Sequence, residues 1–83
     1  MFEENTLMNV TESEYKWMVE LMTADLIRML IERNGYSFTR AFEVVYNSDT
    51  YKALIRPETR LYFQSPGYVC SYLQNEIEIG KMA

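Results

Sequence analysis

The longest regular pattern in the chain is a run of apolar residues spaced three and four positions apart, with no glycine or proline before Gly35. At about 100° per residue, this spacing gathers them on one helical face. Thr11 and Glu14 stand in front of the run at the spacing of a capping box. Asn34-Gly35 is a typical helix end, because glycine takes the left-handed conformation without steric cost. We predict a helix from about Glu12 to Arg33, with a core face of Tyr15, Met18, Val19, Met22, Leu26, Met29 and Leu30.

The same helix carries a second apolar stripe on its far side, among Glu20, Arg28 and Glu32. A helix that is apolar nearly all round is either central in its fold or shared with a partner. An 83-residue chain buries only a limited core, so a second copy or a different protein is one candidate to cover this stripe. The alternative is that the later helices wrap around the first. The stripe consists of Trp17, Leu21, Ala24, Ile27 and Ile31.

A second helix is expected after Gly35, over about Phe38 to Tyr46. Ser37 is a suitable N-cap, and Phe38, Ala41, Phe42 and Val45 then recur at helical spacing. Ser48 or Asp49 can cap a short third piece that presents Tyr51, Leu54 and Ile55. That piece must end before Pro57, since the residue before a proline is pushed out of helical geometry.

The last helix begins at Ser65-Pro66, with serine as the cap and proline at the first position. Gly80 ends it. Its apolar stripe consists of Val69, Cys70, Leu73 and Ile77, with Tyr68 and Tyr72 beside it.

The segment between the two prolines fits two conformations. Pro57 suits the first position of a one-turn helix. The residues Leu61 to Gln64 fit either a helix or an extended segment, since leucine, tyrosine and phenylalanine also suit strands. We expect a turn of helix followed by extended chain. The fold class predicted is all-α: a small single-domain bundle of four or five helices over residues 11–80, with one long N-terminal helix, two short connecting helices and a flexible arm at residues 1–10.

Composition narrows the classes of function. The net charge is −4 and the five arginines are spread among acids, which argues against a nucleic-acid partner, because phosphate binding needs a concentrated positive surface. No apolar run approaches the roughly 20 residues of a membrane span. Residues 1–10 carry acids where a signal peptide has bases, and the single cysteine allows no internal disulfide. We expect a cytoplasmic protein without a membrane partner.

Candidate chemistry is sparse. Histidine is absent, which removes the commonest general base and the usual nucleophile pairs. There is no glycine-rich phosphate loop and no cluster of metal-ligand spacing, so we expect no enzyme, no metal and no cofactor. Cys70 lies within an apolar stripe and is expected to pack in the core as a small hydrophobe. The acids of the first helix are expected to form a solvated face.

The short stretch between the second and last helices carries a resemblance. "NSDTYKAL", "RPETRLYFQSPGYV" and Tyr72-Leu73 together resemble a family of small, uncharacterised bacterial helical domains, known only as a domain of unknown function. The resemblance covers about Thr23 to Glu76. It implies a small helical domain without an established activity, and a partner-binding role in toxin–antitoxin gene neighbourhoods. Arg60 stands where the family pattern has glycine, which argues against a tight left-handed turn there.

Two kinds of function remain. The preferred hypothesis is a non-enzymatic protein–protein interaction module that binds another protein or itself, as a homodimer. The alternative is a DNA-binding, transcription-regulating domain that uses the second and third helices. The polar residues of the stretch also have structural roles available, as caps and turn residues. The predicted partner-binding residues are Trp17, Leu21, Ala24, Ile27, Ile31, Tyr51, Tyr62, Gln64 and Tyr68.

Overall fold

A computed structural model describes residues 11–80, and the predicted arm at residues 1–10 lies outside the described residues. The described part is all-α, as predicted, with four α-helices and two single-turn 3₁₀-helices. The order is α2 (Glu12–Asn34), α3 (Phe38–Tyr46), α4 (Asp49–Leu54), η1 (Pro57–Thr59), η2 (Leu61–Phe63) and α5 (Pro66–Glu78).

The ends of α2 follow from the residues that flank it. The Thr11 hydroxyl accepts the Glu14 N–H at 3.2 Å, and the Glu14 carboxylate accepts the Thr11 N–H at 3.2 Å, which completes the predicted capping box. Gly35 takes φ 72° and donates its N–H to the Ile31 carbonyl. A residue with a Cβ would be strained in this left-handed conformation, so glycine fixes the end of α2.

The three later α-helices begin at the predicted serine caps. Ser37 Oγ accepts the N–H three residues on at 3.1 Å, Ser48 Oγ at 2.9 Å and Ser65 Oγ at 3.2 Å. Each of these bonds satisfies one N–H that the helix itself leaves without a partner. Asn47 ends α3, and its side-chain amide donates to the Glu43 carbonyl at 2.8 Å.

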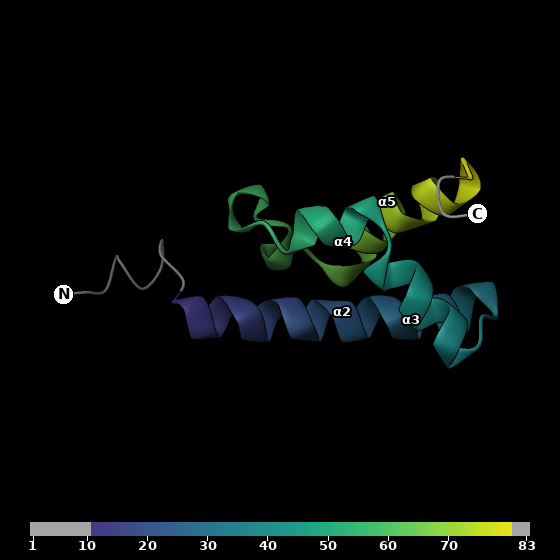
Figure 1. The fold of residues 1–83 in the computed structure, drawn as a ribbon, viewed down its shortest axis with the longest axis horizontal. Helices are drawn as coiled ribbons and strands as arrows, with labels where there is room; N and C mark the ends of the chain where they lie inside the picture. Colours follow the sequence, from purple (N-terminus) through teal and green to yellow (C-terminus); the bar gives the residue numbers. More distant parts are fainter. Residues whose placement is uncertain (1–10, 81–83) are drawn as a thin grey trace.

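The helices form two layers. The long helix α2 makes one layer, and α4 and α5 make the other. Figure 1 shows α2 along one side of the molecule, with α4 and α5 stacked across from it and α3 folded back against its C-terminal half. The molecule is elongated, 47 Å by 21 Å by 17 Å, because α2 alone is about 34 Å long at 1.5 Å per residue. A reciprocal amide pair ties the far end of α2 to α5: Gln74 Nε2 donates to Asn34 Oδ1 at 2.7 Å, and Asn34 Nδ2 donates to Gln74 Oε1 at 3.2 Å.

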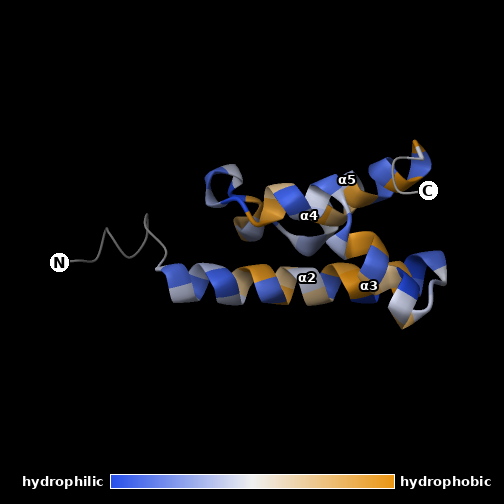
Figure 2. Ribbon diagram, in the orientation of Figure 1, coloured by the Kyte–Doolittle hydropathy of each residue, from blue (hydrophilic) through white to orange (hydrophobic). Residues whose placement is uncertain are grey.

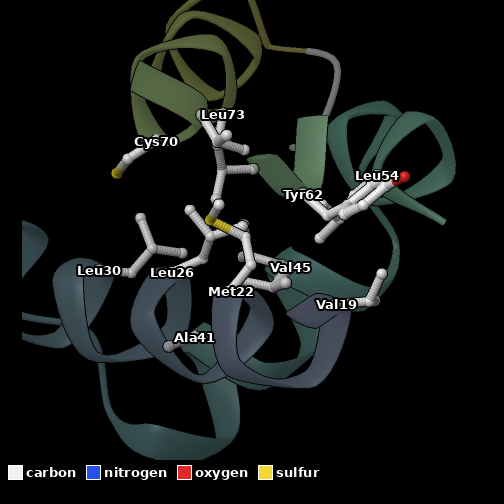
Figure 3. Close-up of a cluster of buried hydrophobic side chains, with 12 residues drawn as sticks. Val19, Met22, Leu26, Leu30, Ala41, Val45, Leu54, Tyr62, Cys70 and Leu73 are labelled. Atoms are coloured by element: carbon white, nitrogen blue, oxygen red, sulfur yellow. The ribbon is translucent and has the colours of Figure 1, made fainter. Parts of the chain in front are cut away.

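One hydrophobic core lies between the two layers, and all four α-helices and η2 contribute to it. Figure 3 shows Leu26 and Leu30 of α2 pointing toward Cys70 and Leu73 of α5. The predicted core face of α2 is confirmed: Val19, Met22, Leu26 and Leu30 are buried, and Tyr15, Met18 and Met29 pack against them partly buried. The predicted stripe of α5 is confirmed in the same way.

A buried carboxylate joins α4 to α5. Glu76 of α5 is 9% exposed, and its two oxygens accept the backbone N–H groups of Asp49 and Thr50 at 2.8 Å each. The Thr50 hydroxyl also donates to Glu76. These groups open the first turn of α4, where unpaired N–H groups and the helix dipole both favour a negative charge. Glu76 therefore holds α4 against α5.

The expectation of an extended segment after Arg60 was wrong. Residues Leu61–Phe63 form the 3₁₀-helix η2, with Phe63 N–H bonded to the Arg60 carbonyl at 3.0 Å and Gln64 N–H to the Leu61 carbonyl at 3.0 Å. No neighbouring strand within residues 11–80 is available to pair with an extended segment, so the backbone satisfies its hydrogen bonds locally.

The doubt about a left-handed turn at Arg60 was also wrong. Arg60 takes φ 58° and ψ 20°, and it is the only non-glycine residue with positive φ among those described. This residue reverses the chain between η1 and η2. The reversal carries the Tyr62 ring into the core, where it meets Tyr15 edge-on with ring centroids 5.0 Å apart.

Candidate interaction surface

The far stripe of α2 is not covered by the later helices. Trp17 is 62% exposed, Leu21 50% and Ile31 37%, and Ala24 is also exposed. Ile27 is half-buried and reaches the edge of the core. The alternative in which the later helices wrap around α2 is therefore excluded for the central part of this stripe. Figure 2 shows apolar blocks along the middle of α2 that continue into α3.

The outer side of α3 extends this apolar surface. Phe38, Phe42 and Tyr46 stand four residues apart and are 61%, 43% and 41% exposed. Their rings form a row with Tyr51 of α4, with successive centroids 5.9, 4.5 and 4.7 Å apart. The predicted apolar stripe of α3 is thus divided: Ala41 and Val45 are buried with Val44, whereas Phe38 and Phe42 face outward.

A hollow lies where the two helices meet. It has a volume of about 480 Å³ and is lined by side chains of both α2 and α3. We call the combined surface of stripe and hollow the outer face. It consists of Trp17, Leu21, Ala24, Ile27 and Ile31 from α2 and Phe38, Phe42 and Tyr46 from α3.

A charged cluster of α2 lies beside the apolar stripe. Arg28 is paired with Asp25 at 3.0 Å and with Glu32 at 3.4 Å. The hydrogen bond to Asp25 and the charge of Glu32 raise the pKa of the Arg28 guanidinium. These pairs are exposed and add little to stability, but they fix the direction of the arginine. The outer face is therefore an apolar surface with an ordered polar rim.

The other predicted binding residues, Tyr51, Tyr62, Gln64 and Tyr68, do not form one patch. Tyr62 is 9% exposed and belongs to the core, so its ring is not available to a partner, and its prediction as a binding residue was wrong. Tyr51 is half-buried against Tyr46. Tyr68 is exposed but lies on α5, where its hydroxyl is 3.0 Å from that of Tyr72. Gln64 is exposed at the end of η2.

Cys70 has the environment of a core residue. It is fully buried, and this burial raises the pKa of its thiol, although nearby Arg33 acts in the opposite direction. A raised pKa leaves less of the nucleophilic thiolate. The thiol thus acts as a small hydrophobe, as predicted.

Two smaller hollows carry fewer features of a binding site. One, of about 300 Å³, lies beside Glu76 and Tyr72, where the Glu76 carboxylate is already bonded to α4. The other, of about 280 Å³, lies between α2 and α4 beside Tyr15 and Tyr51. Burial raises the pKa of both tyrosines. No group of three or more His, Cys, Asp or Glu within residues 11–80 is placed to hold a metal ion.

The basic residues of α4 and its flank have acidic neighbours. Lys52 lies 3.8 Å from Asp49, and Arg56 lies 3.0 Å from Glu58. Acidic neighbours reduce the positive potential on which phosphate binding depends, so these pairs do not favour the DNA-binding alternative, which stays a prediction. No helix in residues 11–80 has both the length and the hydropathy of a membrane span.

The α3 side of the outer face was missed in the sequence. Phe38, Phe42 and Tyr46 were not among the predicted binding residues, and the available signal was an aromatic residue at every fourth position over one helix. The role of Glu76 had no signal, because its partners lie 26 and 27 residues away. Asn47 caps the end of α3.

Comparison of the chain with models of known protein families, with curated proteins and with solved structures gave no match. The family resemblance of residues 47–73 therefore stays a prediction.

Proposed function

We propose that this chain is a non-enzymatic protein–protein interaction module and that the outer face is its binding surface. The supporting observation is that seven exposed apolar side chains of α2 and α3, together with half-buried Ile27, lie outside the core, and that six of these eight residues line one hollow. Soluble monomers rarely leave a large apolar patch exposed, and a patch with a polar rim is typical of a protein-binding site.

The shape of the outer face indicates which secondary structure the bound segment of the partner has. The hollow between α2 and α3 is walled by aromatic rings on one side and by Ile27 and Ile31 on the other. Such a groove accepts an amphipathic helix, whose apolar residues at intervals of three and four fill the groove. The expected partner segment is therefore a helix with an apolar stripe. Two candidates would carry such a helix: a second copy of this chain, through its own α2, and a toxin-like neighbour of the kind that the family resemblance implies.

Binding should depend most on the aromatic members of the outer face. Trp17 and Phe38 are the most exposed of them. Large aromatic side chains give much contact area for little loss of conformational freedom and dominate the energetics of many interfaces. Arg28, held in place by two acids, would set the orientation of the partner more than the affinity.

The test compares a tagged chain with four substituted versions of it, two on the outer face and two controls. Trp17→Glu and Phe42→Glu place charges on the outer face, whereas Lys52→Glu and Glu78→Lys place them on exposed sites elsewhere. The tagged chain is mixed with an untagged copy and with proteins of its host, and bound chains are quantified. The proposal predicts a stoichiometric partner that both outer-face variants lose and both controls keep. It fails if such a partner is retained by the outer-face variants, or if none binds the unsubstituted chain.

A further inference from the structure

The partner of the outer face can be named more closely, on the assumption that the proposed function holds. We infer that it is a second copy of this chain, packed so that the two α2 helices run antiparallel and cross at Ala24. Three observations lead to this arrangement: the position of the large Trp17 and of the hollow on either side of Ala24, the small side chain of Ala24 itself, and the area of the outer face.

The outer face of one copy fits the outer face of a second copy when a twofold axis passes through Ala24. Trp17 projects from α2 seven residues before Ala24, and Ile31, at the edge of the hollow, stands seven residues after it. Each is about 10 Å from Ala24 along the axis, at 1.5 Å per residue. In an antiparallel pair with a twofold axis at Ala24, the Trp17 of each copy meets Ile31 and the hollow of the other. A twofold interface requires this kind of match, because one surface must fit itself.

The residue at the crossing point suits a close approach. Ala24 is exposed and has the smallest side chain of the stripe. Two helices cross at a short distance only where the side chains between them are small. The larger Trp17 and Leu21 then lie to one side of the crossing, where the hollow of the second copy has room for them.

The area of the outer face is sufficient for a dimer. Its six large exposed side chains are 37% to 62% accessible. Taking roughly 200 Å² for each side chain, they offer about 600 Å² per copy. Two copies would thus bury about 1,200 Å², which reaches the range of specific, stable interfaces, about 1,200–2,000 Å². The six are Trp17, Leu21, Ile31, Phe38, Phe42 and Tyr46.

Cysteine cross-linking tests the crossing point. Ala24→Cys places two thiols next to the twofold axis, within the Cα separation of about 4.4–6.8 Å that a disulfide needs. Lys52→Cys is the control, exposed on α4 and away from the outer face, and the single native cysteine is buried. Mild oxidation of the full chain should give a covalent dimer with Ala24→Cys and only monomer with Lys52→Cys and with the unsubstituted chain. Equal cross-linking of the two variants would overturn the arrangement.

Truncation of Trp17 tests the register independently. In the proposed pair the Trp17 ring fills the hollow of the second copy, so Trp17→Ala should raise the dissociation constant about tenfold or more, measured by sedimentation of the full chain over a dilution series. A Trp17→Ala variant that associates as tightly as the unsubstituted chain would exclude the proposed register, provided that circular dichroism shows it folded.

The outcomes separate this inference from the proposed function. If the chain sediments as a monomer at every concentration and Ala24→Cys forms no covalent dimer, a second copy is not the partner. If Trp17→Glu then still abolishes binding of another protein, the outer face remains a binding surface. If no chain of any kind binds, both proposals fail.

Discussion

Glu76 and Thr50 are 26 residues apart in the chain, and yet the carboxylate of the first accepts both the backbone N–H, at 2.8 Å, and the hydroxyl of the second. Together with the Asp49 N–H, this contact fixes the start of α4 on α5. A buried carboxylate is costly unless it is fully hydrogen-bonded, and here the unpaired N–H groups of a helix start supply the donors.

Glu76→Gln should destabilise the fold. The neutral amide offers one acceptor oxygen in place of two, so a buried N–H of α4 loses its partner, at a cost of about 1–3 kcal/mol in the free energy of unfolding. Urea titration followed by circular dichroism measures this change. The matched control is Glu78→Gln, two residues on and exposed, which should stay within about 0.5 kcal/mol. Equal effects at the two positions would contradict the role given to Glu76.

Arg60→Gly should stabilise the fold. Arg60 occupies the left-handed region at φ 58°, which costs a residue with a Cβ roughly 1–2 kcal/mol and costs glycine nothing. The greater freedom of glycine in the unfolded chain offsets about 0.5–1 kcal/mol of this gain. The expected net effect is a higher midpoint of thermal unfolding.

The control for Arg60 is Gln64→Gly, at an exposed position with φ −81°. No strain is relieved there, so only the entropic cost remains, and the midpoint should fall. If both glycine variants lower the midpoint by the same amount, Arg60 is not strained in the folded protein.

Tyr62→Ala and Tyr68→Ala should differ in their effect on stability. Tyr62 is buried against Tyr15, and its removal leaves a cavity that costs about 3–5 kcal/mol, as for other large aromatic residues. Tyr68 is about half exposed, and its removal should cost less than about 1 kcal/mol. Thermal or urea unfolding of the two variants measures the difference. A small loss of stability in Tyr62→Ala would show that the Tyr62 ring is not buried in the folded protein.

Cys70 should react with a thiol reagent only when the protein opens. Burial raises the pKa of its thiol, so the neutral form is favoured in the folded state. The unfolded thiol ionises first, near its ordinary pKa of about 8.5, and the stability contributed by Cys70 is therefore lost as the pH rises above that value. Alkylation should be slow in buffer and fast in urea. Rapid alkylation in buffer, with a rate that rises through neutral pH, would show an accessible thiolate.

The sequence was sufficient for those features that neighbouring residues determine. The capping box at Thr11, the glycine end of α2 and the serine caps all depend on contacts within four residues, and all are confirmed. The two faces of α2 followed from helical spacing alone. Helical spacing does not show which side of a short helix faces the core. Phe38 and Phe42 of α3 are large and apolar, and yet they are exposed.

Distant contacts account for the other differences. Tyr62 is in the core because Arg60 takes a left-handed conformation that glycine usually provides. Glu76 is buried because the start of α4 packs against it and supplies its hydrogen-bond donors. Neither relationship leaves a local pattern, and the tyrosines that lie close together in the sequence are consequently directed to separate places in the fold.

The most direct test of the binding role of the outer face is the fluorescence of Trp17, the only tryptophan in the chain. Its indole is 62% exposed in the isolated molecule, so any partner that covers the outer face must move it from water to an apolar environment. Emission is recorded over a dilution series and again with any captured partner. If the outer face is the binding surface, the emission should be blue-shifted in the complex and should return to that of a solvated indole on dilution. The Phe42→Glu variant should show no such shift. A solvated emission in the presence of a bound partner would contradict the binding role of the outer face.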